Sequence, residues 1–110
     1  MEGFVKGDIV VIDFPYSDFK NIKRRPVLIL KVPKGHDVIV AQITGSSYEK
    51  IVEVSLKEND FSKGNLKRES FVRIDKIASI EKSLIKYKAC SLKHEKFEEI
   101  LNQIVSFLRS

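Results

Sequence analysis

The hydrophobic positions of this 110-residue chain form short runs first and a helical pattern last. Asp8–Phe14 and Pro26–Val32 are almost wholly apolar and rich in β-branched residues, which is typical of buried strands. Val38–Thr44 is a third run of this kind. Ile51–Leu56 alternates apolar and polar residues, which predicts a strand with one buried face. The first half of the chain therefore predicts a sheet.

The second half predicts one more strand and then a helix. Ser70–Ile77 is strand-like, with Ala78–Ile85 as a possible short extension, and the polar connection Lys57–Glu69 has room for one helical turn. From Lys93 onward the apolar residues recur at steps of three and four, which predicts an amphipathic helix. The apolar face of that helix comprises Phe97, Ile100, Leu101, Ile104 and Leu108.

The start of the predicted helix has its own signals. Ser91 is a candidate N-cap, and Glu95, Glu98 and Glu99 favour the positive end of the helix dipole. Several short strands and one terminal helix predict a mainly β fold of the α+β class, with a small, strongly bent sheet or barrel. No linker or repeat divides the chain, so we expect a single domain over residues 1–110.

Composition allows a nucleic-acid partner and excludes a scaffold held together by disulfide bonds. Hydrophobic residues make up 43% and charged residues 32%, which is typical of a globular protein. The net charge of +5 and the pI near 9.4 fit a nucleic-acid partner or a role in solubility. The lone Cys90 excludes an intramolecular disulfide and is expected in the core.

Targeting and metal-binding signals are missing from the sequence. The first residues do not resemble a signal peptide, and no run reaches the ~18 apolar residues of a membrane span, so we expect a soluble, cytoplasmic protein. No metal-ligand spacing is present, and no cofactor is expected. His36, in a turn, and His94, near the helix start, are expected on the surface rather than as a ribonuclease pair.

Three features could carry chemistry. Arg25 precedes a proline, which favours extended backbone, and its guanidinium offers a planar fork to phosphate oxygens; the alternative is a solvated arginine. Thr44 ends a predicted strand just before Gly45, where its hydroxyl could donate to a phosphate or simply form a turn. Arg73 and Asp75 share one face of a predicted strand, as a proton-transfer pair or as a structural ion pair.

The segments "KGDIVVIDFPYSD", "KRRPVLIL", "AQITGS" and "ESFVRIDKIASIEKSLI" occur in this order over nearly the whole chain. Together they resemble the PemK/MazF family of toxins of type II toxin–antitoxin systems. The resemblance implies a curved antiparallel sheet of SH3-like barrel type with a C-terminal helix, assembling as a homodimer. It also implies a sequence-specific, metal-independent endoribonuclease, with single-stranded RNA (mRNA) as substrate, a cognate antitoxin as partner and growth arrest as the outcome.

The resemblance also implies roles for individual residues. Arg25 would stabilise the charge on the phosphorane and donate a proton to the leaving oxygen, and Thr44 would hydrogen-bond the scissile phosphate. Arg73 and Asp75 match the catalytic arginine and aspartate of the PemK-like branch. RNA supplies its own nucleophile, the 2′-OH, so an arginine, a hydroxyl and a carboxylate suffice in principle. DNA, which lacks that hydroxyl, should not be cut.

The loop Pro15–Arg24 departs from some family members because it has no histidine. The general base is therefore open: Asp75, Asp18 or weaker base assistance could serve. Ser46 is a rival hydroxyl donor to Thr44. We expect Lys20, Lys23 and Arg24 to guide RNA by their charge, Tyr16 and Phe19 to stack on bases, and Ser46 to bind RNA as a hydroxyl donor.

Two other functions fit the same fold. One is a non-catalytic SH3-like module that binds nucleic acid or protein through the basic face. The other is a toxin of this fold that poisons DNA gyrase by contact. The combination of Arg25, Thr44 and the Arg73–Asp75 pair favours the nuclease, because a binding module does not need it.

Overall fold

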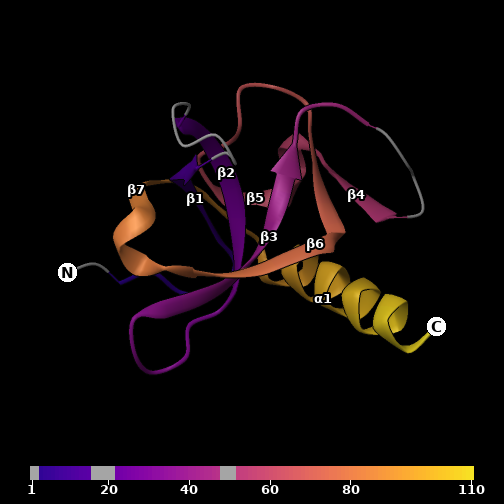
Figure 1. Ribbon diagram of the computed structural model, residues 1–110. Coiled ribbons are helices and arrows are strands. Elements are labelled where there is room, and N and C mark those ends of the chain that lie inside the picture. The colour runs from indigo at the N-terminus through magenta and orange to yellow at the C-terminus, as the bar shows by residue number, and fades with distance from the viewer. Residues whose placement is uncertain (1–2, 16–21, 48–51) are drawn as a thin grey trace.

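The strands and the helix appear in a computed structural model that describes residues 3–15, 22–47 and 52–110 (Figure 1). Two short 3₁₀ turns interrupt the second half, η2 (Glu58–Asp60) and η3 (Lys82–Leu84). The main elements are β1 (Asp8–Pro15), β2 (Ile22–Lys31), β3 (Asp37–Thr44), β4 (Glu53–Leu56), β5 (Phe61–Lys63), β6 (Ser70–Glu81), β7 (Ile85–Leu92) and α1 (His94–Arg109).

Antiparallel pairing joins these strands into one sheet in the order β4-β6-β3-β2-β1-β7-β5. The register shifts between Ile9 and Val10, between Ile29 and Lys31, and between Ala41 and Ile43. Such bulges bend a strand and increase its twist. The sheet therefore curls toward a half-barrel (Figure 1), which confirms the predicted curved antiparallel sheet with a C-terminal helix.

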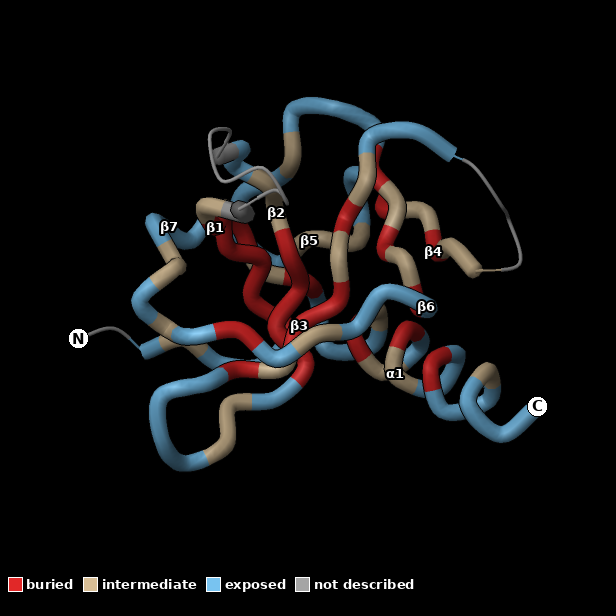
Figure 2. The backbone as a smooth tube through the Cα atoms, viewed as in Figure 1, coloured by how far each residue is buried: buried red, intermediate tan, exposed pale blue. Residues whose placement is uncertain are grey.

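Both faces of the central strands are buried (Figure 2). One core contains Ile9 and Leu28 together with three side chains of α1, Phe97, Ile100 and Ile104. The second core, on the other face, is formed mainly by Val10, Ile12, Val27, Ile29, Val38 and Val40. Double-sided burial explains why the first two strands are apolar runs without alternation, and each such side chain contributes roughly 1.5–3 kcal/mol.

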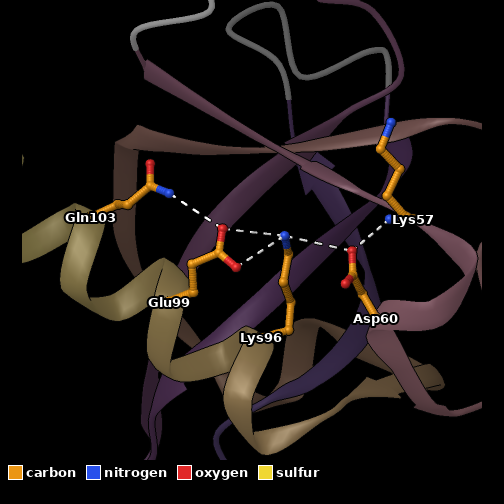
Figure 3. A network of polar contacts seen from close by, with 5 residues as sticks. All are labelled: Lys57, Asp60, Lys96, Glu99 and Gln103. Carbon is orange, nitrogen blue, oxygen red and sulfur yellow. Dashed lines mark hydrogen bonds and ion pairs between the residues drawn. The ribbon is translucent and has the colours of Figure 1, made fainter.

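A polar network fastens α1 to the η2 turn (Figure 3). The Nζ of Lys96 lies 3.6 Å from Oδ2 of Asp60 and 3.4 Å from Oε2 of Glu99. Asp60 Oδ2 also accepts the backbone N–H of Lys57 at 2.7 Å, and Gln103 Nε2 donates to Glu99 at 3.4 Å. The Lys96 side chain is only 12% exposed, so this ion pair is shielded more than an ordinary surface pair.

The structure corrects several predicted elements. β7 was not predicted at all, and neither was β5, which follows the helical turn that was predicted within Lys57–Glu69. β6 is one continuous strand that includes the first half of the expected extension, Ala78 to Glu81, and η3 follows it. β2 begins at Ile22 rather than Pro26, because Ile22–Arg25 pair with the end of β1.

The helix also differs from its prediction in two details. The N-cap is Lys93, with no side-chain cap, because Ser91 belongs to β7. Leu108 is 69% exposed, and Phe107 packs against the core in its place. His36 and His94 are exposed and Cys90 is buried, as predicted. No helix in the described part of the chain is long and apolar enough to cross a membrane.

Candidate nucleic-acid interface

A pocket of about 770 Å³ lies where β1, β2, β3 and β7 meet the connection between β5 and β6. Its apolar lining comes from strands far apart in the sequence and consists of Val11, Pro26, Ile43, Leu66 and Ala89. Its polar lining includes Thr44, Asn65, Ser70 and Tyr87. A hollow of this size that combines an apolar lining with a few polar groups is the usual form of a ligand site.

The charged side chains that line this pocket all carry the same sign. They are Lys23, Arg24, Arg25, Lys67, Arg68 and Lys88. No Asp, Glu or His lines the pocket among the described residues. A concave surface with charges of one sign concentrates counter-ions, so this pocket favours a polyanion.

Arg25 reaches the pocket from within β2. It pairs with Ile12 of β1, and its side chain is partly buried, with Nε shielded from solvent. Lys23 and Arg24 lie in the same strand, which corrects the expectation that they belong to the loop. Pairing with β3 begins only at Val27, so at Pro26 β2 is hydrogen-bonded to a neighbouring strand on one edge only. The missing N–H of proline is tolerated at such a position.

Thr44 reaches the same pocket from the end of β3. The ladder between β2 and β3 ends at the Val27–Gln42 pair, and Arg25 and Thr44 each lie two residues beyond that pair on their own strand. The Thr44 hydroxyl accepts the backbone N–H of Ser46 at 3.3 Å and donates to the Ser46 carbonyl at 3.3 Å. This turn holds the hydroxyl in place, and its single proton is available to a phosphate only after rotation.

Arg73 and Asp75 form the expected pair but do not line this pocket. Arg73 Nε and Nη2 donate to the two oxygens of Asp75 at 2.9 and 2.8 Å. These hydrogen bonds lower the pKa of the Asp75 carboxyl below its ordinary value. Ser46 is exposed and also lies outside the pocket lining. The catalytic roles of Arg73 and Asp75, and RNA binding by Ser46, remain predictions.

The "GD" pair at the start of β1, Gly7 and Asp8, helps to position a residue that lines the pocket. Gly7 has φ +96°, a conformation that favours glycine, and it turns the chain into the strand. Asp8 is buried and accepts a hydrogen bond from the Ser91 hydroxyl at 2.8 Å. The Nζ of Lys88, a pocket residue, lies 3.5 Å from Asp8 Oδ2, so Asp8 helps to position Lys88.

Gly64 sets the close approach of the β5–β6 connection to β7. Its φ is +66°, and a Cβ built on it would lie 3.0 Å from the Ala89 carbonyl oxygen and 3.2 Å from Cys90 Cβ. Only glycine fits without displacement. The next four residues, Asn65 to Arg68, all line the pocket, so Gly64 seats this wall against β7.

Sequence reasoning missed part of this surface. Tyr87 and Lys88 lie on the unpredicted β7, and Lys67 and Arg68 lie in a segment read as a plain connection. The basic–aromatic triplet "KYK" and the run "NLKR" were the available signals. Other predicted residues lie outside the described part of the chain; these are Tyr16, Asp18, Phe19 and Lys20.

Two further sets of residues bear on possible reactivity. Burial, with a smaller contribution from the Asp8 charge, raises the pKa of the Cys90 thiol to about 11, so the native thiol is a poor nucleophile. Across residues 3–15, 22–47 and 52–110, no three His, Cys, Asp or Glu side chains form a group that could hold a metal ion.

Solved structures with this fold include several toxins and endoribonucleases. MazF from Deinococcus radiodurans is 19% identical, with a TM-score of 0.76 and 100% of both chains covered. An endoribonuclease from a mycobacterial species, in complex with its cognate antitoxin, is 15% identical, with a TM-score of 0.76 over 96% of this chain and 95% of that one. The Mycobacterium tuberculosis toxin MazF-mt6 is 24% identical, with a TM-score of 0.69 over 88% and 91%.

These identities show a shared fold, and among curated proteins no sequence matches the chain. The family match rests on the sequence itself and extends over residues 5–108. That range contains every element from β1 to β7 and nearly all of α1. The chain therefore belongs to the family of PemK-like, MazF-like toxins of type II toxin–antitoxin systems.

Proposed function

We propose that this toxin is a sequence-specific endoribonuclease that cleaves single-stranded RNA in the basic pocket without a metal. The observation that carries the proposal is that Arg25 and Thr44 line one pocket, whose described lining has six cationic side chains and no carboxylate. Family membership and structural neighbours described as endoribonucleases support the same reaction.

In the proposed reaction the 2′-OH of one nucleotide attacks the adjacent phosphorus, and the bond to the 5′-oxygen of the next nucleotide breaks. The products are a cyclic phosphate and a 5′-OH. Arg25 stabilises the negative charge that develops on the phosphate oxygens and donates a proton to the leaving oxygen. The Thr44 hydroxyl rotates away from the Ser46 carbonyl and then donates its hydrogen bond to a non-bridging oxygen of the phosphate.

The proton of the attacking 2′-OH needs an acceptor. None of the described residues that line the pocket is a carboxylate or a histidine. Asp75 is bound to Arg73 away from the pocket lining, so we place Arg73 and Asp75 second to Arg25 and Thr44 in the proposed chemistry. Asp18 and weaker base assistance remain the other candidates for this step.

Partners follow from the same proposal. We propose that a cognate antitoxin occupies the RNA-binding surface, as complexes of MazE with MazF are known from Deinococcus radiodurans. We also propose a cytoplasmic homodimer whose activity on mRNA arrests growth. The whole chain, residues 1–110, would act as the single toxin domain.

The decisive experiment compares a long RNA with a matched DNA in excess chelator, followed by mapping of the cleaved ends. We expect cuts in RNA alone, at a short motif, and no cleavage by Arg25→Ala. Lys31→Ala is the matched control, because Lys31 is an exposed cation at the other end of β2, outside the pocket. Intact RNA with folded wild-type protein would refute the nuclease, and full activity of Arg25→Ala would refute the site.

A further inference from the structure

We propose that Tyr87 is the platform on which an unpaired base of the substrate stacks. The inference rests on the proposed function and deepens it, because it names the side chain that would hold an unpaired base of the single strand. Tyr87 was not part of the sequence-based prediction, and its role follows from its place in the sheet.

The register sets Tyr87 in line with two apolar residues of the pocket lining, Val11 and Pro26. Val11 of β1 pairs with Pro26 on β2 and with Tyr87 on β7, so the three residues form one row across adjacent strands. All three line the pocket. Two strand spacings separate Pro26 from Tyr87, roughly 10 Å between backbones. Arg25, the neighbour of Pro26 in β2, lines the same pocket.

The exposure of Tyr87 distinguishes it from the rest of the row. Val11 is 9% exposed, as expected for a core residue, but Tyr87 is 52% exposed. Among the described residues that line the pocket, Tyr87 is the only aromatic one. A half-exposed aromatic ring inside a pocket leaves a large apolar face in water, and a ligand with a flat apolar face would cover it.

The surrounding charges indicate which flat ligand fits. Lys88 follows Tyr87 in β7, and Lys67 and Arg68 line the same pocket. Surfaces that bind single strands combine a cationic groove for the backbone with aromatic rings for the bases. A base inside a duplex is already stacked and paired, so it cannot cover the ring without being extruded. The arrangement therefore favours single-stranded RNA over a duplex.

A stacking platform contributes to binding of the ground state and of the transition state alike. Its loss should therefore raise KM and leave kcat nearly unchanged. We expect Tyr87→Leu, which keeps the apolar bulk but removes the ring, to raise KM by roughly 5- to 100-fold on single-stranded RNA. Tyr87→Phe retains the ring and should behave as the wild type, which separates stacking from any role of the phenol hydroxyl.

A binding measurement keeps the test independent of catalysis. The chain has no tryptophan, so Tyr87→Trp introduces a single fluorescent reporter at the pocket. Short 2′-O-methyl homopolymers of each base cannot be cut, because the nucleophile is blocked. We expect at least one of them to quench the fluorescence, and the same strand annealed in a duplex to quench much less.

The outcomes separate the two proposals. Quenching by the blocked strands with no cleavage of RNA by the wild type would refute the nuclease and retain the platform. RNA cleavage with no quenching, or equal KM values for Tyr87→Leu and Tyr87→Phe, would refute the platform and retain the nuclease. A changed oligomeric state of Tyr87→Leu in sedimentation, with unchanged KM, would instead assign the ring to a subunit interface and overturn the inference.

Discussion

The hydroxyl of Thr44 has a defined position, held by Ser46, in the pocket that Arg25 also lines. Thr44→Val keeps the side-chain volume but removes the proton donor, and a hydrogen bond to a charged group contributes about 1.5–3 kcal/mol. We expect RNA cleavage to slow by roughly 10- to 100-fold.

Thr44→Ser is the control for that substitution, because it restores a hydroxyl that can make the same turn with Ser46. Rates come from single-turnover cleavage, with circular dichroism to verify folding. Equal rates for Thr44→Val and the wild type would remove the hydroxyl from the reaction.

Because of the Arg73–Asp75 pair, we expect part of the free energy of unfolding to be lost at acidic pH. Because Arg73 lowers the pKa of the Asp75 carboxyl in the folded protein, the stabilisation is fully present above the ordinary carboxyl pKa, roughly 3.9. It is lost as the pH falls through the lower, folded value. The Asp75 side chain is 27% exposed, so the contribution is about 1 kcal/mol or less.

We expect Asp75→Asn to be less stable than the wild type at pH 7 and to lose less stability on acidification. Urea unfolding at a series of pH values measures both. Parallel pH curves for the two proteins would mean that the pair contributes nothing, and the conservative replacement limits any change in packing.

At the scale of elements, the β5–β6 connection depends on Gly64. Gly64→Ala places a Cβ against the Ala89 carbonyl and forces a left-handed conformation on alanine. We expect a loss of about 1–3 kcal/mol in the free energy of unfolding and weaker RNA binding, because Lys67 and Arg68 shift with the connection. Thermal unfolding and binding titrations measure the two effects.

Gly3→Ala is the matched control, since nothing lies within 4 Å of a Cβ at Gly3. A Gly64→Ala protein with wild-type stability and RNA affinity would show that the β5–β6 connection can shift without cost. Loss of stability alone, with affinity intact, would separate the fold from the pocket.

Elements with a strong local pattern could be predicted, and elements that depend on distant pairing could not. The residues of α1 repeat at three- and four-residue steps, and those of β1 and β3 are visibly apolar. β7 offers only two buried residues, Cys90 and Leu92, and becomes a strand because β1 pairs with it from the other end of the chain.

The lining of the candidate pocket divides along the same line. Arg25 and Thr44 could be chosen as candidates from the sequence because a following proline or glycine marks their local backbone, and their roles in the reaction stay predictions. Tyr87, Lys67 and Arg68 enter the pocket through the β1–β7 register and the contact at Gly64, which no local pattern records.

At the scale of the whole molecule, the basic pocket predicts how RNA binding responds to salt. Each phosphate contacted by a cation releases a counter-ion, so the logarithm of the affinity falls with the logarithm of the salt concentration. We expect the slope to decrease by roughly 0.7 for Lys67→Ala on a single strand. Titrations of a blocked 2′-O-methyl RNA at several salt concentrations measure the slope.

Lys34→Ala is the control for the salt experiment, because Lys34 is exposed and lies outside the basic pocket. It changes the net charge of the molecule by the same amount. An equal change of slope in both variants would attribute the effect to overall charge rather than to contacts in the pocket.

The buried thiol of Cys90 can report how often β7 separates from its neighbouring strands. It is the only thiol of the chain, it is buried directly after the pocket residue Ala89, and burial raises its pKa to about 11. Alkylation near neutral pH must therefore wait until β7 separates from its neighbours. We expect bound RNA to lengthen the labelling half-life in proportion to occupancy. Mass spectrometry of the wild-type protein would then measure the rate of Cys90 labelling, and with it the rate at which β7 opens, without any substitution.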